Sequence, residues 1–446
     1  MTRRDFLPVM ATPALVAQPS RPNIVFVLID DLRPDALGCT GHSFSITPQI
    51  DRLAKEGARF TNAFVTTPLC SPSRASYLTG RYVHAHGVTG NGDNAALSHN
   101  LVTFPRLLHD AGYETAYMGK WHMGTDDSPR PGFDRWISFR GQGQFEDPPM
   151  NIDGKQIKAT GYMTNLLSQH AVDFIRKPHT KPFCLYLAHK AVHAPFTPEP
   201  RYKDHFSSNP IVRSANAKDD LRNKPAMTRL VEGRPAVQPS GGSSDELIRN
   251  QLRCLRSIDD GIGEMLRALE ETKQLDNSVF VFTSDNGYFW GEHGLGDKRW
   301  AHEESIRIPL IFRYPKMAPQ GMTIPHDALN IDIAPTMLAF GGLKPPKDVH
   351  GRSLLPLFRR EAPSGWRTSF LAEYFEEGRF PRTPTWQAIR TPRWKYIRYP
   401  TLQDSDELYD LASDPGEMRN IINDSAISGT LKNLRQDLEK QLKATV

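Results

Sequence analysis

Two continuous apolar runs constrain the fold more than any other feature of this chain. They are Asn23–Ile29 (NIVFVLI) and Ser278–Thr283 (SVFVFT), and neither alternates apolar with polar residues. Runs of this kind are typical of strands that are buried on both faces of a largely parallel sheet. We therefore predict an α/β fold in which helices flank a large sheet.

Polar side chains follow the predicted strands at the points where they end. Beyond the two apolar runs, further strands are predicted at 114–118 and 183–188, and both run into polar segments. In open α/β sheets ligands gather at the carboxyl ends of strands, so a site is expected there. The side chains concerned are Asp30, Asp31, Lys120, His122, His193, Asp285 and Asn286.

Asp30, Asp31, Asp285 and Asn286 form a set of hard oxygen donors. Such donors suit Ca²⁺ or Mg²⁺ better than a softer metal. A thiolate at Cys70 would be a poor fifth ligand for a hard cation. The alternative interpretation is that the two acidic turns lie apart in space and bind nothing.

Residues 70–81, CSPSRASYLTGR, predict a short helix with a cysteine at its start. Pro72 suits the first helical position, Ser71 can cap the free amides and Gly80 can close the helix. Arg74 lies one turn after the cysteine on the same side, so this helix N-terminus is a suitable place for an anionic substrate. The alternative is a buried structural cysteine before an ordinary helix.

Other segments carry the signals that begin and end helices. Thr47-Pro48 and Gly57 bound one predicted helix, and Ser243 with Glu246 has capping-box spacing before a long one. A strand is predicted between them at about 58–65. Further predicted helices are 103–111, 334–340 and an amphipathic segment from about 428.

The chain is predicted to have two folded parts. A proline-rich stretch at 345–365 separates a catalytic domain, 21–350, from a C-terminal subdomain, 351–446. The polar segment 207–244 is interpreted as a long surface excursion rather than a domain. Two segments of the subdomain alternate in the manner of antiparallel strands: 385–390 and 393–399.

Composition excludes some classes of function. The net charge is +5 over 446 residues with no long basic run, so nucleic-acid binding is not implied, although polyanionic substrates are favoured. The cysteines show no C-x-x-C spacing, which indicates neither a zinc site nor a disulfide scaffold. They are Cys39, Cys70, Cys184 and Cys254.

The first residues predict an export signal. Arg3 and Arg4 precede a short apolar stretch that ends near Ala17, which looks like a twin-arginine signal over residues 1–20. The stretch is too short to span a bilayer, so no membrane insertion is expected. The predicted location is periplasmic or secreted, and the alternative is a tail that stays in the cytoplasm.

The helix segment resembles the signature of the formylglycine-dependent (type I) sulfatases, C-x-P-x-R followed by A-S-x-L-T-G-R. The matching residues are Cys70, Pro72, Arg74, Ala75, Ser76, Leu78, Thr79, Gly80 and Arg81. Further similar segments extend over nearly the whole mature chain: 23–25, 30–31, 291–294, 303–309, 407–411 and 414–415. The resemblance implies an alkaline-phosphatase-like sandwich with a large mixed, mostly parallel sheet and a small C-terminal α+β domain that contains an antiparallel sheet.

The resemblance also implies how the nucleophile is made and held. A formylglycine-generating maturation enzyme would oxidise Cys70 to an aldehyde, whose hydrate attacks sulfur. Arg74 would fix the hydrate and Asp285 would take its proton. One Ca²⁺, or Mg²⁺, would be bound by the formylglycine together with Asp30, Asp31, Asp285 and Asn286.

The remaining roles implied by the resemblance concern the sulfate and the leaving group. Lys120 and Lys298 would hold the sulfate oxygens. His193, with Lys298, would protonate the departing sugar oxygen. His122 would remove a proton from the second hydroxyl of the hydrate, so that the aldehyde reforms and sulfate leaves.

Segments away from the signature are most similar to exported glycan sulfatases of the N-acetylglucosamine-6-sulfatase kind, with iduronate-2-sulfatase-like enzymes next. They are 330–336, 351–356 and 373–376. His302 departs from the pattern, because many relatives carry tyrosine there. The predicted substrate is a sulfated carbohydrate. Two alternatives stay open: a phosphate or phosphonate monoester hydrolase of the same superfamily, and a sulfated-glycan-binding pseudoenzyme in which Cys70 stays a thiol.

Overall fold

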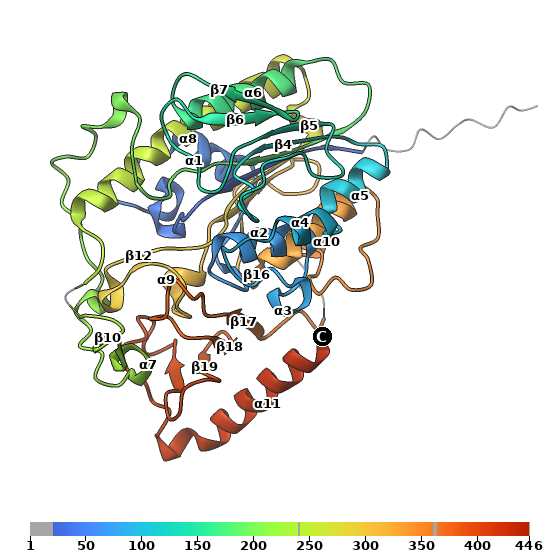
Figure 1. The fold of residues 1–446 in the computed structure, drawn as a ribbon. Coiled ribbons are helices and arrows are strands. Elements are labelled where there is room, and N and C mark those ends of the chain that lie inside the picture. The colour runs from blue at the N-terminus through green and yellow to red at the C-terminus, as the bar shows by residue number, and fades with distance from the viewer. Residues whose placement is uncertain (1–20, 240, 360–363, 446) are drawn as a thin grey trace, which may run out of the picture.

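The computed structural model describes residues 21–239, 241–359 and 364–445. Within these residues a ten-stranded sheet runs through the molecule with helices on both sides (Figure 1). The predicted export signal, residues 1–20, lies outside the described residues. In spatial order the strands are β15 (Met322–Ile324), β2 (Ala58–Phe60), β14 (Leu310–Arg313), β11 (Ser278–Ser284), β1 (Asn23–Ile29), β8 (Phe183–Ala188), β4 (Glu114–Gly119), β5 (Arg135–Ser138), β6 (Pro149–Ile152) and β7 (Lys155–Lys158).

The sheet is mixed and its centre is parallel. β1 pairs in parallel with β11 on one side and with β8 on the other, and β8, β4 and β5 continue the parallel arrangement. β14 pairs antiparallel with both β11 and β2, and β6 pairs antiparallel with both β5 and β7. The predicted fold class is therefore confirmed.

Helices cover both faces of the sheet (Figure 1). The larger ones are α1 (Pro48–Glu56), α2 (Cys70–Thr79), α5 (Phe104–Asp110), α6 (Met163–Arg176), α8 (Asp245–Glu271) and α10 (Ile333–Phe340). α1, α6 and α8 lie together on one face, and α2, α5 and α10 on the other. Val25 and Val27 of β1 pack into the core on the first side, whereas Phe26 and Leu28 pack into the core on the second. Successive side chains of a strand point to opposite faces of the sheet. Because both faces of β1 are covered by helices, the residues on each face must be apolar.

Outside the C-terminal part, the remaining helices and strands are short. The helices are α3 (Val83–His86), α4 (Ala95–Asn100), α7 (Pro225–Thr228) and α9 (Glu303–Ile306). The two-stranded sheets are β3 (Ala63–Phe64) with β16 (Ala328–Leu329), β9 (Leu230–Val231) with β10 (Arg234–Pro235), and β12 (Phe289–Trp290) with β13 (Gly296–Asp297). The single strand expected at 58–65 is thus divided into β2 and β3, which pair with different partners.

Helix α2 begins at Cys70, the cysteine expected at its start, but Pro72 is its third residue rather than its first. Leu69 occupies the N-cap position, and the Ser71 hydroxyl donates to the carbonyl oxygen of His122 instead of capping the helix. Gly80 ends the helix as expected, with φ of 72° in the left-handed region that glycine adopts without strain.

The start of α8 also differs from the prediction by one residue. Ser244 is the N-cap, and its hydroxyl accepts from the amide of Leu247 at 3.2 Å. The Ser243 hydroxyl instead donates to the carbonyl of Phe289 at 2.9 Å. The local sequence allows either serine to cap, and packing against the β12 segment decides between them.

The polar segment 207–244 is not only a surface excursion, as was expected. It contains α7, β9 and β10, and its Leu221 and Met227 are fully buried. Lys224 is also buried, and its Nζ donates to the carbonyl of Met418 at 3.1 Å. A few buried residues, spaced irregularly along the segment, therefore hold it against the rest of the protein. Such spacing gives no hydrophobic periodicity in the sequence.

The C-terminal part contains an antiparallel sheet and a helix, as predicted. They are β17 (Phe370–Tyr374), β18 (Trp386–Arg390), β19 (Trp394–Arg398), β20 (Glu407–Asp410) and α11 (Ser428–Ala444). Leu434 and Leu438 of α11 are buried in the core that this part shares with one face of the large sheet. Lys395 is fully buried, with its Nζ 2.8 Å from carboxylate oxygens of both Glu303 and Glu417. The boundary at 350/351 stays a prediction.

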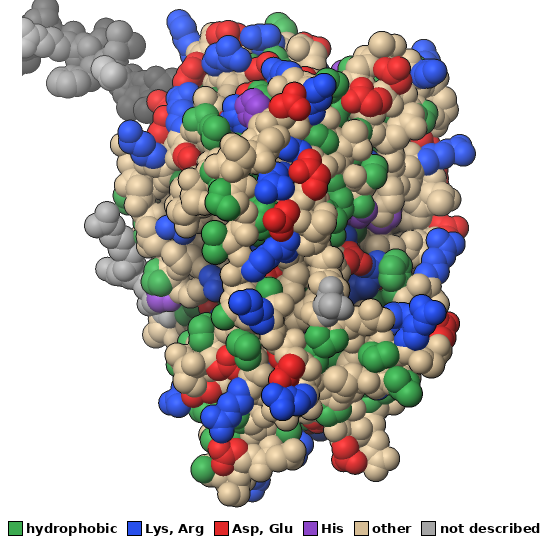
Figure 2. Space-filling view, turned by 90° about the vertical axis from the view of Figure 1, so that its left-hand side faces the viewer, with side chains coloured by type: hydrophobic (Ala, Val, Ile, Leu, Met, Phe, Trp, Pro, Cys, Tyr) green, Lys and Arg blue, Asp and Glu red, His purple; other side chains and the backbone are tan. Residues whose placement is uncertain are grey.

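No helix in the described part of the chain is both long and apolar enough to cross a membrane. Figure 2 shows one side of the molecule, on which Lys and Arg side chains are interspersed with Asp and Glu. Mixed charges of this kind give a weak long-range field over that side.

Candidate active site

Four neighbouring strands end at the same edge of the large sheet. β1 ends before Asp30, β11 before Asp285 and β4 before Lys120, and β8 leads into the loop that carries His193. β11, β1, β8 and β4 are adjacent and parallel, so their carboxyl ends lie side by side. The structure thus brings together side chains from all four predicted segments.

Three carboxylates form the centre of this cluster. One oxygen from each of Asp30, Asp31 and Asp285 lies within 4.8 Å of the others, and all three side chains are buried. The amide of Asp31 also donates to Asp285 Oδ1 at 3.2 Å. Buried like charges at such separations require compensating cations.

Asn286 contributes an oxygen whose bonding is incomplete. Its Nδ2 donates to Asp31 Oδ1 at 2.6 Å and to the carbonyl of Gly287 at 2.8 Å. Its Oδ1 is buried and has no hydrogen-bond donor among the described residues. Because buried acceptors are rarely left unpaired, and because carboxylate and amide oxygens are the ligands of hard cations, these residues fit Ca²⁺ or Mg²⁺.

Cys70 is the first residue of α2 and is fully buried beside the carboxylates. Its Sγ lies 3.5 Å from Asp30 Oδ1. Burial raises the pKa of the Cys70 thiol to about 12, although Lys120 and Lys298 oppose the shift. An unmodified thiol here stays protonated near neutral pH and is a poor nucleophile.

Arg74 lies one turn further along α2 and points into the cluster. Its Nε and Nη2 are 2.9 and 2.8 Å from Asp285 Oδ2, and its Nη1 donates to the carbonyl of Lys120. Burial and the carboxylate of Asp30 raise the pKa of Asp285, whereas Arg74 acts against this shift. A divalent cation at the carboxylates would likewise favour the ionised form of Asp285.

Lys120 and Lys298 are each paired with a carboxylate. The Nζ of Lys120 contacts Asp30, and the Nζ of Lys298 lies 2.6 and 2.8 Å from the two oxygens of Asp31. Burial alone would raise the pKa of Asp30, but Lys120 and the other nearby cations hold it well below its usual range. Both lysines therefore lie beside the expected metal ligands, and the sulfate would have to lie within their reach.

Two histidines complete the predicted set. His193 Nε2 is 3.7 Å from Asp31 Oδ2, and its Nδ1 is 3.0 Å from the carbonyl of Ala194, so Nδ1 carries the proton of the neutral ring. The His193 side chain is 15% exposed, so a substrate can reach it. The Nδ1 of His122 lies 3.4 Å from the Ser71 hydroxyl. Burial lowers the pKa of His193 to about 4, and it lowers that of His122 well below its ordinary value.

The backbone is strained at two of these positions. Asp31 and His122 have φ values of 63° and 59°, in the left-handed region that residues other than glycine adopt uncommonly. Gly119 has φ of 117°, and a Cβ there would lie 1.8 Å from the carbonyl oxygen of Ala188. Only glycine therefore allows β4 to run so close to β8 immediately before Lys120.

A family model described as Sulfatase matches residues 22–343. The chain belongs to the sulfatase family. A second model, described as N-sulphoglucosamine sulphohydrolase, C-terminal, matches residues 291–444. The chain is thus a sulfuric ester hydrolase, and the family and the alkaline-phosphatase-like fold predicted from the signature are confirmed.

Known proteins similar to this sulfatase include a curated enzyme and several solved structures. It is 34% identical over 95% of its length to an N-acetylglucosamine-6-O-sulfatase of Bacteroides thetaiotaomicron, of which it covers 86%. A solved structure in complex with the substrate D-glucosamine-2-N,6-O-disulfate matches with a TM-score of 0.86 and 33% identity, over 95% of this chain and 98% of that one. A phosphonate monoester hydrolase of Agrobacterium radiobacter shares the fold, with a TM-score of 0.78 and 22% identity over 96% of each chain.

Two residues of the sulfatase that the sequence did not indicate hold the backbone of the site through hydrogen bonds. Asn91 Oδ1 accepts the amide of Ser71 at 3.0 Å and so caps α2 from a distant loop. The hydroxyl of Tyr117 donates to the carbonyl of Lys120 at 2.5 Å. No local pattern marks Asn91, because it acts on a helix start 20 residues earlier in the chain. Tyr117 lies only three residues before Lys120, but its place within the apolar strand β4 indicates a core residue rather than a hydrogen-bond donor.

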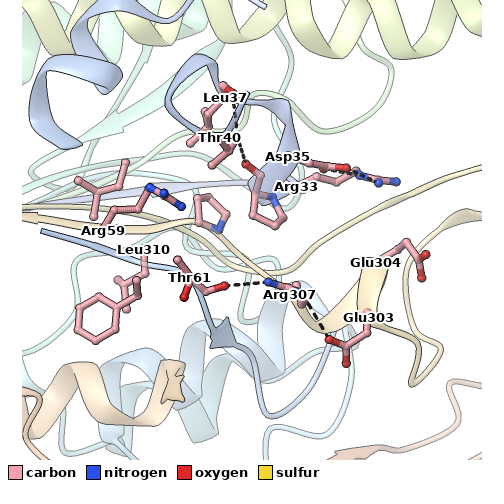
Figure 3. A pocket seen from close by; sticks show the side chains of 14 residues that line it. Arg33, Asp35, Leu37, Thr40, Arg59, Thr61, Glu303, Glu304, Arg307 and Leu310 are labelled. Atoms are coloured by element: carbon pink, nitrogen blue, oxygen red, sulfur yellow. Dashed lines mark hydrogen bonds and ion pairs between the residues drawn. The ribbon is translucent and has the colours of Figure 1, made fainter. Parts of the chain in front are cut away.

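A separate cavity of about 380 Å³ lies beside β2 and β14 of the sulfatase (Figure 3). It combines arginines with apolar residues, and Figure 3 shows the Arg33–Asp35 pair and the bond from Arg307 to Thr61 on its walls. None of the predicted catalytic or metal-ligating residues lines this cavity. It is therefore distinct from the carboxylate cluster.

Proposed function

We propose that this sulfatase is exported and hydrolyses the 6-O-sulfate ester of N-acetylglucosamine or of a related unit in a sulfated glycan. Two similar proteins support this substrate. One is named an N-acetylglucosamine-6-O-sulfatase, and the other was solved in complex with a glucosamine that carries a 6-O-sulfate. The support for export is the Arg3-Arg4 segment, which predicts a periplasmic or secreted enzyme.

The observation that carries the proposed mechanism is the position of Cys70. Its side chain is buried, 3.5 Å from Asp30 and at the start of the helix that also carries Arg74. A thiol with a raised pKa next to carboxylates suits neither nucleophilic attack nor a hard cation. Formylglycine, made by a maturation enzyme, would supply hydrate oxygens at the same position and so resolves both conflicts.

A divalent cation held by Asp30, Asp31, Asp285 and Asn286 would supply Lewis-acid stabilisation of charge on the sulfate oxygens. Ca²⁺ or Mg²⁺ suits these ligands, since all are oxygens. Lys120 and Lys298 add positive charge on the same side, where the equatorial oxygens of the sulfate develop charge.

The remaining residues move protons. Asp285, whose Oδ2 accepts Arg74 Nε at 2.9 Å, is the proposed base for the proton of the nucleophile at residue 70. His193 Nε2 faces the cluster and is the proposed acid for the leaving sugar oxygen, with Lys298 beside the same carboxylate. Burial lowers the pKa of His193 to about 4, and the negative charge of a bound sulfate ester would raise it. His122, whose Nδ1 lies 3.4 Å from the Ser71 hydroxyl, is the proposed base for sulfate release.

The proposed function is tested with protein produced together with a formylglycine-generating enzyme. The assay compares 6-O-sulfated N-acetylglucosamine with the 6-phosphate of the same sugar, and an aryl sulfate with an aryl phosphate. The mass of tryptic peptide 60–74 reports whether residue 70 is an aldehyde or a thiol. Faster turnover of the phosphates would favour the phosphate or phosphonate hydrolase, whereas binding of the sulfated sugar without turnover and with a thiol at residue 70 would favour the pseudoenzyme.

The general acid is tested by changing the leaving group. We expect His193→Ala to lower kcat on the 6-O-sulfated sugar by roughly 10²- to 10³-fold, since a sugar alkoxide needs protonation. The same variant is expected to lose much less activity on 4-nitrophenyl sulfate, because nitrophenolate leaves without an acid.

His122→Ala is the matched comparison for His193→Ala. It is expected to slow release of sulfate equally for both substrates, because that step no longer contains the leaving group. If His193→Ala lost equal activity on both substrates, in assays where the first step limits the rate, the acid would have to be another residue.

A further inference from the structure

Glu377 reaches from the C-terminal sheet to the loops around the active site. It lies between β17 and β18, and its side chain is 11% exposed. Its Oε1 accepts the amide of Asn91 at 2.9 Å, and its Oε2 accepts Arg299 Nε at 2.9 Å. One carboxylate therefore joins two loops that are far apart in the sequence.

The contact with Asn91 leads to the nucleophile. Asn91 Oδ1 accepts the amide of Ser71 at 3.0 Å, and Ser71 directly follows Cys70 at the start of α2. The first amides of a helix have no partner within the helix, and Leu69 at the N-cap position supplies none. Asn91 takes the place of a local cap, and Glu377 holds the backbone of Asn91.

The contact with Arg299 leads to Lys298. Arg299 has φ of 84°, so its backbone is held in a conformation that arginine rarely adopts. Its carbonyl accepts Trp386 Nε1 at 2.7 Å, and its guanidinium lies 3.7 Å from the ring centroid of Phe380. Glu377, Phe380 and Trp386 of the C-terminal part thus all contact Arg299. The preceding residue, Lys298, donates to Asp31.

We propose that Glu377 is a positioning residue that couples the C-terminal sheet to both halves of the active site. Through Asn91 it fixes the start of α2 and residue 70, and through Arg299 it fixes the loop of Lys298. The inference rests on the proposed roles of Cys70 and Lys298. Charge-assisted hydrogen bonds are strong enough for this task, and a displacement of about 1 Å at a reacting group can lower the rate about 100-fold.

The kinetic test uses Glu377→Ala, with Glu376→Ala as the matched control, because Glu376 is the exposed neighbour of the same charge. We expect Glu377→Ala to lower kcat about 100-fold with little change in KM. The loss is expected to be equal for the sugar sulfate and the aryl sulfate, since the nucleophile rather than the leaving group is misplaced. Ordinary kcat in Glu377→Ala would overturn the proposal, and so would an equal loss in Glu376→Ala.

A double-mutant cycle separates positioning from a general loss of stability. Asn91 lies between Glu377 and the start of α2, so Asn91→Ala should disturb the same contact. The double variant is therefore expected to be as active as the less active of the two single variants. If Glu377→Ala does not fold, Glu377→Gln replaces it, because the amide keeps one acceptor and loses the second. Additive losses would mean that the two residues act independently and would overturn the coupling.

Amide hydrogen exchange tests the same coupling without relying on turnover. Peptides that cover residues 70–73 and 89–93 are expected to exchange faster in the Glu377 variant and to be unchanged in Glu376→Ala. Unchanged exchange in both peptides would overturn the inference. Absence of sulfatase activity in the parent enzyme would refute the proposed function, and the exchange result would still decide on the contact.

Discussion

Replacing Cys70 by alanine or by serine is expected to abolish turnover of sulfate esters, with kcat/KM falling by at least about 10⁴-fold. Alanine removes the nucleophile. Serine restores one hydroxyl, but it has no second hydroxyl that could expel sulfate without attack by water. The measurement is steady-state kinetics on the sugar sulfate and the aryl sulfate, together with thermal unfolding to show that the fold is retained.

Cys184→Ala is the matched control for the Cys70 variants. Cys184 is also fully buried, but it lies within β8 and away from the carboxylates. It should keep ordinary turnover while losing the same buried sulfur. Ordinary turnover in Cys70→Ala would show that another residue attacks sulfur. Protein made without the maturation enzyme is expected to fold and to be inactive for the same reason.

Removing divalent cations is expected to lower kcat by about 10³-fold or more, because a Lewis acid contributes several kcal/mol of transition-state stabilisation. Ca²⁺ or Mg²⁺ should restore activity better than Zn²⁺, since all proposed ligands are oxygens. The melting temperature should rise with Ca²⁺ concentration, because the cation binds the folded state.

Asn286→Ala tests whether the carboxylate cluster is the cation site. It removes the buried oxygen that has no donor in the described part of the chain, and should raise the Ca²⁺ concentration needed for half-maximal activity. Asp348→Asn, which removes a carboxylate with a 61% exposed side chain, should have no effect on this concentration. Restoration by Zn²⁺ alone would point to a different set of ligands.

His302 is the residue that departs from the family pattern. The residue is fully buried, and neither ring nitrogen has a hydrogen-bond partner among the described residues. Its ring lies 4.5 Å from that of His293, and its Nε2 is 4.0 Å from Glu407. His302 therefore lies in a buried contact between the catalytic part and β20, and not among the residues of the carboxylate cluster.

Much of the site could be predicted because its side chains follow strong local signals. Asp30 and Asp285 come directly after fully apolar strands, and the ends of adjacent parallel strands meet at one edge. The helix that begins at Cys70 was also predictable, since Gly80 marks its end. Its cap could not be predicted, because the acceptor for the amide of Ser71 is Asn91 and not a residue next to the helix start.

The sequence by itself determined the type of fold, the identity of the clustered side chains and the family. It could do so because strand burial, helix ends and the signature from Cys70 to Arg81 are properties of residues that are close together in the chain. Only the tertiary structure decided which distant groups complete the site. Asn91 and Glu377 carry no local signal, since Asn91 bonds to the start of α2 and Glu377 bonds to the loop of Asn91, and both contacts depend on how distant parts of the chain pack together.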